Sequence, residues 1–78
     1  MVSKAFKDEF TSKYACAIII DGESYLATRR PMLGYDEKGI TVRVEGENGK
    51  VEIMAQLPWS STLVIIPAGD WLEREGCR

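Results

Sequence analysis

Apolar and polar residues change their spacing along the chain, and the spacing predicts the elements. In residues 2–13, Val2, Phe6 and Phe10 recur at every fourth position, and Tyr14 continues the series. This spacing is typical of the apolar stripe of an amphipathic helix. A helix this short is marginal by itself. We therefore expect it to dock as a lid over one face of a sheet, in preference to forming a detachable arm.

From Tyr14 to Arg30 the pattern predicts a hairpin centred on Asp21-Gly22. This dipeptide favours a two-residue turn because both residues tolerate positive φ. Pairing through the turn sets Ile18 opposite Tyr25 and Cys16 opposite Ala27, and leaves Ala17, Ile19, Ser24 and Leu26 on the other face. Both faces are mostly apolar, so we expect the first strand to be central and covered by the helix or by another subunit.

Residues 31–38 are predicted to form a loop. Pro31 stops the preceding strand, and Gly34 allows a sharp bend. Exposed Met32, Leu33 and Tyr35 would form a contact patch on this loop.

Residues 39–57 predict a second hairpin, with strict alternation on both sides of Asn48-Gly49. A two-residue loop at 48–49 makes all the inward pairs apolar, so the turn and the pattern select the same register. These pairs are Val44 with Ile53, Val42 with Ala55, and Ile40 with Leu57. The outward pairs are Thr41 with Gln56, Arg43 with Met54, and Glu45 with Glu52, of which the last is like-charged and unfavourable.

The apolar run 63–66 predicts a fifth strand that ends at Pro67. Residues 70–75 fit either a sixth short strand or a helical turn with Asp70 and Glu73 as a capping box. The expected fold is α+β, with an N-terminal helix (2–13) followed by five or six antiparallel strands (14–75) in a small barrel or sandwich.

Length and composition indicate one small domain, 1–78. With 78 residues, of which 45% are hydrophobic and 28% charged, the chain has the composition of a globular protein. A net charge of −2 gives no support for a general polyanion binder. The polar N-terminus and short apolar runs predict no signal peptide and no membrane contact. Cys16 is expected in the core and Cys77 free, which fits a reduced, cytoplasmic setting.

The chain contains no histidine, so Ser-His and Cys-His nucleophile pairs are excluded. No glycine-rich phosphate loop is present, and we expect no metal and no cofactor. Acidic neighbours such as Asp36-Glu37 fit a solvated face better than a catalytic pair. We therefore expect a protein that is not an enzyme, with a carboxylate site between subunits as the remaining catalytic alternative.

Four basic residues, Arg29, Arg30, Arg43 and Lys50, could form a strip near Tyr25, Tyr35 and Trp59. Basic side chains interleaved with aromatic rings are suited to single-stranded RNA or DNA. Arg29, Arg30, Arg43 and Tyr35 are thus the nucleic-acid candidates, as an alternative to a plain solvated surface, which is favoured.

The run Leu63-Val64-Ile65-Ile66 carries none of the charges that protect an edge strand, and Trp59 and Trp71 flank it. Aromatic residues beside an apolar edge are typical anchors of interfaces. A symmetric partner would cover such an edge. The predicted interface residues are therefore Trp59, Leu63, Val64, Ile65, Ile66 and Trp71.

Two stretches, GKVEIMAQLPWSSTLVII (49–66) and ACAIIIDGESYLATRR (15–30), resemble hairpins of the tryptophan-activated RNA-binding attenuation protein family. That resemblance implies a ring-like β assembly. The chain departs from the family at 63–66, where the RNA-contacting basic residues have no match. It also departs at Arg30-Pro31-Met32-Leu33, which replaces the tryptophan-holding loop.

The functional expectation is a small interaction module that forms a homo-oligomer through a β edge and binds a protein or small-molecule partner. Accessory proteins of phages and mobile elements often have this profile. The alternatives are a single-stranded nucleic-acid-binding small β-barrel, in a ring or not, and an enzyme with a carboxylate site at a subunit interface.

Overall fold

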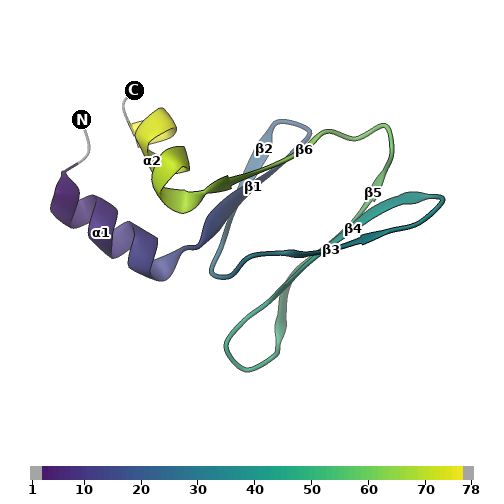
Figure 1. Cartoon of the computed structure of the whole chain (residues 1–78), viewed down its shortest axis with the longest axis horizontal. Coiled ribbons are helices and arrows are strands. Elements are labelled where there is room, and N and C mark those ends of the chain that lie inside the picture. Colours follow the sequence, from purple (N-terminus) through teal and green to yellow (C-terminus); the bar gives the residue numbers. More distant parts are fainter. Residues whose placement is uncertain (1–2, 77–78) are drawn as a thin grey trace.

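The structure, a computed structural model, describes residues 3–76, which form two helices and six antiparallel strands (Figure 1). The elements are α1 (Lys4–Lys13), β1 (Cys16–Ile20), β2 (Glu23–Ala27), β3 (Met32–Tyr35), β4 (Gly39–Glu45), β5 (Val51–Pro58), β6 (Leu63–Pro67) and α2 (Ala68–Gly76). One sheet has the order β2-β1-β6 and the other β3-β4-β5. The α+β class is confirmed, but the described strands form two separate sheets and no closed barrel.

Helix α1 begins after Ser3, whose Oγ accepts a hydrogen bond from the Phe6 N–H at 3.2 Å. It ends where Tyr14 becomes extended, in agreement with the predicted end at residue 13. Val2, the first member of the predicted stripe, lies outside the described residues. The helix packs mainly on α2. The prediction that it covers one face of a sheet is therefore wrong. The spacing of apolar residues identifies a stripe, in which Phe10 is half-buried and Phe6 is 52% exposed, but it does not say which element the stripe packs on.

The first hairpin has the predicted turn and register. Asp21 and Gly22 have φ values of 49° and 87°, as a type I′ turn requires. Ile18 lies opposite Tyr25, and Cys16 lies opposite Ala27. β1 pairs with β2 on one side and with β6 on the other, so its predicted central position is confirmed.

The predicted loop at 31–38 is wrong over residues 32–35, which form strand β3 beside β4. The β2 ladder ends at Ala27, before Pro31 is reached, and a new strand begins directly after Pro31. Asp36 then makes the turn into β4, because its Oδ1 accepts hydrogen bonds from the backbone N–H of Lys38 at 2.8 Å and of Gly39 at 3.0 Å. The sixth strand is therefore β3 and not the segment 70–75.

The second hairpin has the predicted inward pairs, from Val44 with Ile53 to Ile40 with Leu57, but not the predicted loop. The N–H of Gly49 donates to the Gly46 carbonyl at 3.0 Å, and the N–H of Gly46 donates to the Lys50 carbonyl at 2.8 Å. The loop is thus 47–49, one residue longer than predicted.

A β-bulge after Val44 compensates for the longer loop, and Glu45 pairs with Val51. The predicted like-charged pair of Glu45 and Glu52 is therefore not formed. Glu45 instead makes an ion pair with Arg43 at 2.7 Å. Glu52 Oε2 accepts a hydrogen bond from the Thr28 hydroxyl at 2.9 Å.

The C-terminal segment, left open between strand and helical turn, is helix α2, so the β assignment to 14–75 is wrong from residue 68 onward. The helix begins at Ala68, which places Asp70 inside the first turn instead of at the N-cap position of the proposed capping box. Trp71 stacks on Phe10 with ring centroids 5.9 Å apart, and Glu73 forms an ion pair with Lys7.

The main core lies where the two sheets meet. Its buried members are Cys16, Ile18 and Ala27 from one sheet and Val42 and Val44 from the other. Side chains alternate along a strand, so Ala17 faces the opposite side of β1, where α2 contacts the sheet (Figure 1).

The molecule is flat and open for its size. It spans 44 × 30 × 12 Å with a radius of gyration of 13.6 Å, whereas a compact chain of this length has about 11.5 Å. Its accessible surface is 5655 Å², against about 4,700 Å² expected for a compact monomer of this mass. The two sheets therefore cover each other only in part.

Candidate functional site

Strand β6 is an edge of its sheet, and its hydrogen bonds to β1 determine which backbone groups face outward. The Asp21 N–H donates to the Thr62 carbonyl at 3.0 Å, and the Ala68 N–H donates to the Ala15 carbonyl at 3.1 Å. Bonded pairs alternate along an antiparallel ladder, so Val64 and Ile66 direct their N–H and C=O groups toward β1.

The other β6 residues direct their backbone groups away from β1. These are the N–H and C=O of Leu63 and Ile65 and the C=O of Pro67, which has no N–H. No described strand pairs with them. We call this row of unpaired groups, on residues 63–67, the β6 edge.

The side chains of β6 divide between the two faces of its sheet. Leu63 and Ile65 lie on the same face as Ile18, toward the other sheet, and Ile65 is 37% exposed. Val64 and Ile66 lie on the α2 side, where Ile66 is half-buried and Val64 is 42% exposed. The C-terminal helix therefore supplies the cover for one face, but it leaves Val64 open.

The other edge strands carry features that discourage pairing. β2 begins with Glu23; β5 contains the bulge, Glu52 and the terminal Pro58. β3 has only four residues. β6 has no charged side chain, and among its residues only Pro67, at its end, lacks a backbone N–H donor. Among the described strands, β6 is the edge with the least protection against pairing.

The two tryptophans predicted to flank the interface have different environments. Trp59 is 56% exposed, stacks on Tyr35 with centroids 6.3 Å apart, and donates from Nε1 to the Asp36 carbonyl at 3.1 Å. Trp71 is half-buried against Phe10, and its Nε1 is buried without a hydrogen-bond partner among the described residues. The structure thus places Trp71 in the helix pair and Trp59 beside the β3–β4 turn.

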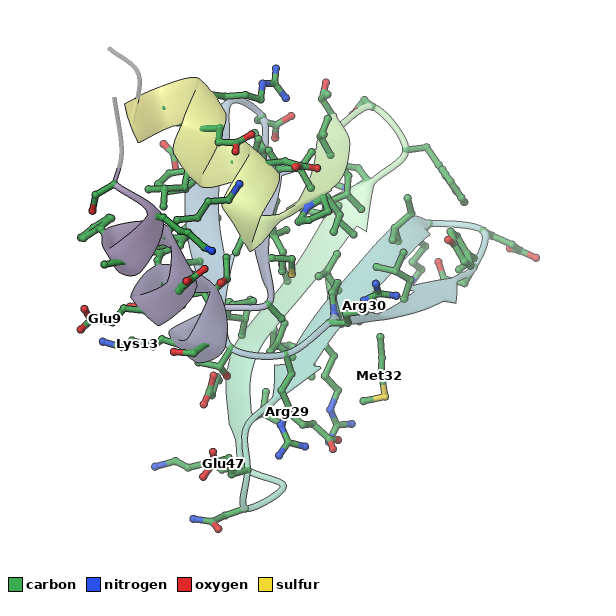
Figure 2. All side chains as sticks on the ribbon, turned by 60° about the vertical axis from the view of Figure 1, so that its left-hand side comes forward. Glu9, Lys13, Arg29, Arg30, Met32 and Glu47 are labelled. Carbon is green, nitrogen blue, oxygen red and sulfur yellow. The ribbon has the colours of Figure 1, made fainter. Side chains whose placement is uncertain are left out.

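The basic candidates do not form one strip. Arg29 lines a hollow of about 470 Å³ beside the β4–β5 loop, and Lys50 lines the same hollow. Arg30 lines a different hollow, and Figure 2 shows the two arginine side chains pointing in different directions. Arg43 lies on the outward face of β4, opposite Met32, and its guanidinium is paired with Glu45.

The hollow that contains Arg30 lies beside the β6 edge and was not anticipated from the sequence. Its volume is about 320 Å³, and it is lined by Ala15, Cys16, Arg30, Pro31, Ile65 and Pro67. The link between the two sheets brings Arg30 and Pro31 next to β6. No local sequence signal could have identified this contact, because the residues are more than thirty positions apart.

Two titratable groups near these surfaces have raised pKa values. Burial raises the pKa of the Cys16 thiol, although the nearby Arg30 lowers it in part. The hydrogen bond from the Tyr25 hydroxyl to Glu23 Oε2, 2.7 Å long, raises the pKa of Tyr25. The Tyr25–Glu23 pair lies on the exposed surface of β2, outside the three hollows of the described residues.

Of the two acidic candidates, Asp36 has a structural role in the described part of the chain. Asp36 Oδ1 accepts two backbone hydrogen bonds in the β3–β4 turn, and Glu37 beside it is exposed. Within residues 3–76, no cluster of three or more His, Cys, Asp or Glu side chains could hold a metal ion. No helix in this range has the length and apolar character needed to cross a bilayer.

Comparison with known proteins gives no relative: no family model, no curated protein and no solved structure matches the chain.

Proposed function

We propose that this protein is a non-catalytic interaction module that self-associates through the β6 edge and, once assembled, binds a protein or small-molecule partner. The observation that carries the proposal is the β6 edge itself. It presents unpaired donors and acceptors on an uncharged strand with exposed apolar side chains at Val64 and Ile65. An edge of this kind pairs readily with another strand.

The surface area supports the same proposal. The accessible surface is 5655 Å², which exceeds the compact-monomer value by about 900 Å². A stable protein interface buries about 800 Å² on each partner. The excess surface is therefore of the size that one interface would remove.

A matched pair of substitutions tests this proposal. Ile65 on β6 is 37% exposed and Val51 on β5 is 38% exposed. Ile65→Lys should yield a monomer by light scattering at tens of micromolar, because a charge at the edge opposes strand pairing. Val51→Lys should keep the size of the parent. Circular dichroism checks that both variants are folded, and a parent protein that is already monomeric would refute the proposal.

One observation favours a second candidate function, binding of single-stranded nucleic acid. Tyr35 and Trp59 are 66% and 56% exposed, and their rings lie within 12° of parallel. Exposed aromatic rings can stack on bases. Oligonucleotide binding should then quench Trp59 fluorescence, weaken with salt and disappear in Trp59→Ala, whereas Trp71→Phe should bind normally. No retention of mixed RNA and DNA oligonucleotides at low salt would remove this candidate.

A further inference from the structure

The β6 edge is complementary to itself in one antiparallel register. Its outward donors are the N–H groups of Leu63 and Ile65, and the same two residues supply outward acceptors. Two copies related by a two-fold axis can align these groups with the axis at residue 63, 64 or 65. The three registers differ in which residues lie opposite each other at the ends of the strand.

An axis at Ile65 would place Leu63 of the second copy opposite Pro67. Proline has no N–H for the ladder, and its ring occupies the space where a donor would be. This register therefore places a steric obstacle at both ends of the paired segment.

An axis at Leu63 would place Ile65 opposite Ser61 of the second copy. Ser61 lies before β6 in the 59–62 turn, and its N–H already donates to the Pro58 carbonyl at 3.0 Å. This register therefore lacks donors at the positions where the ladder requires them.

Building on the proposed self-association, we propose that the partner of β6 is β6 of a second copy, antiparallel about a two-fold axis at Val64. Leu63 of each copy then lies opposite Ile65 of the other, and each of these pairs exchanges both of its hydrogen bonds. Pro67 falls outside the paired residues. The two sheets join into one continuous sheet, with an isologous interface.

The side chains fit the same register. Val64, which is 42% exposed, contacts Val64 of the second copy on the α2 face, in a non-hydrogen-bonded pair with Cα atoms about 4.5 Å apart. On the other face, Leu63 of the second copy lies beside Ile65. Ile65 and Pro31 both line the hollow of about 320 Å³, so Leu63 of the second copy lies next to this hollow. The dimer thus covers exposed apolar side chains on both faces of β6.

A cysteine at the axis tests the register. Val64→Cys, in a Cys77→Ser background, places two thiols within disulfide reach across the axis. Cys16 is 3% exposed and stays out of reach. Under mild oxidation we expect most of the Val64→Cys protein to become covalent dimer, at least fivefold more than with the control Val51→Cys. Val51 is similarly exposed but lies on β5.

The outcomes separate the register from the proposed function. A parent that scatters light as an oligomer while Val64→Cys forms no covalent dimer would overturn the two-fold register and leave self-association standing. The Val64→Cys and Val51→Cys proteins can also be mixed before oxidation. If the two variants cross-link to each other and Val64→Cys homodimers do not form, the two-fold register is overturned in favour of pairing between β6 and β5. A monomeric parent would overturn both proposals.

Discussion

Two glycines of the β3–β4 hairpin, Gly34 and Gly39, should respond oppositely to alanine. Gly39 has a φ of 152°, and a Cβ placed there would lie 1.8 Å from the Leu57 carbonyl oxygen. Gly34 has no positive φ, and its Cβ would meet only the Thr41 Cβ, at 3.9 Å, an ordinary contact. The comparison also tests whether residues 32–35 form a strand or a loop that needs a flexible glycine.

The expected magnitudes follow from these contacts. At Gly39 the backbone conformation alone costs a residue with a side chain about 1–3 kcal/mol. The overlap with Leu57 must in addition separate the ends of β4 and β5, so we expect a total loss of at least about 3 kcal/mol. At Gly34, alanine reduces the freedom of the unfolded chain and should stabilise the protein by about 0.4–1 kcal/mol.

Urea and thermal unfolding, followed by circular dichroism at one protein concentration, measure both changes. The fixed concentration matters because self-association makes the unfolding temperature concentration-dependent. Gly39→Ala should lower the melting temperature by at least about 12 °C, since each kcal/mol corresponds to about 4–8 °C in a domain of this size. A Gly39→Ala protein as stable as the parent, or a Gly34→Ala protein destabilised by more than about 1 kcal/mol, would refute the reasoning.

Three further predictions test the core, the helix pair and the buried thiol. Val42→Ala should cost about 2–3 kcal/mol in urea unfolding, because Val42 is fully buried between the sheets. In a Trp59→Phe background, Phe10→Ala should shift Trp71 emission to the red and cost about 1 kcal/mol; an unchanged spectrum would mean that the rings do not pack. The pKa of Cys16 is raised in the folded state, so the unfolded thiol loses its proton first as pH rises. Stability relative to Cys16→Ala should therefore be constant below the ordinary thiol pKa of 9.0 and fall above it by up to about 1.4 kcal/mol per pH unit. Equal pH profiles for the two proteins would contradict this.

The parts of the fold that were correctly predicted depend on neighbouring residues. The turn at Asp21-Gly22 and the alternation on both sides of it determine the first hairpin, and both signals are local. In the second hairpin the apolar pattern gave the inward pairs correctly although the loop length was wrong. A shift of one residue would expose every inward side chain, so the pattern constrains the register more strongly than the turn does.

The incorrect predictions concern contacts between distant segments. Strand β3 pairs with β4 across Asp36, whose carboxylate makes the turn that Gly34 was expected to make. The segment 68–76 is helical because it packs on β1, β6 and α1, which the sequence of this short segment does not reveal. Arg29 and Arg30 of the predicted strip are neighbours in the sequence, but the link after β2 turns them toward different hollows.

The sequence by itself determined that residues 63–66 form an uncharged strand with more apolar positions than one face requires. It could not determine what covers them, because cover depends on packing between elements far apart in the chain. The tertiary structure decided that α2 covers Ile66 and leaves Val64 exposed. Pairing with β1, bounded by the Asp21–Thr62 and Ala15–Ala68 hydrogen bonds, decided that Leu63 and Ile65 present their backbone groups at an open edge.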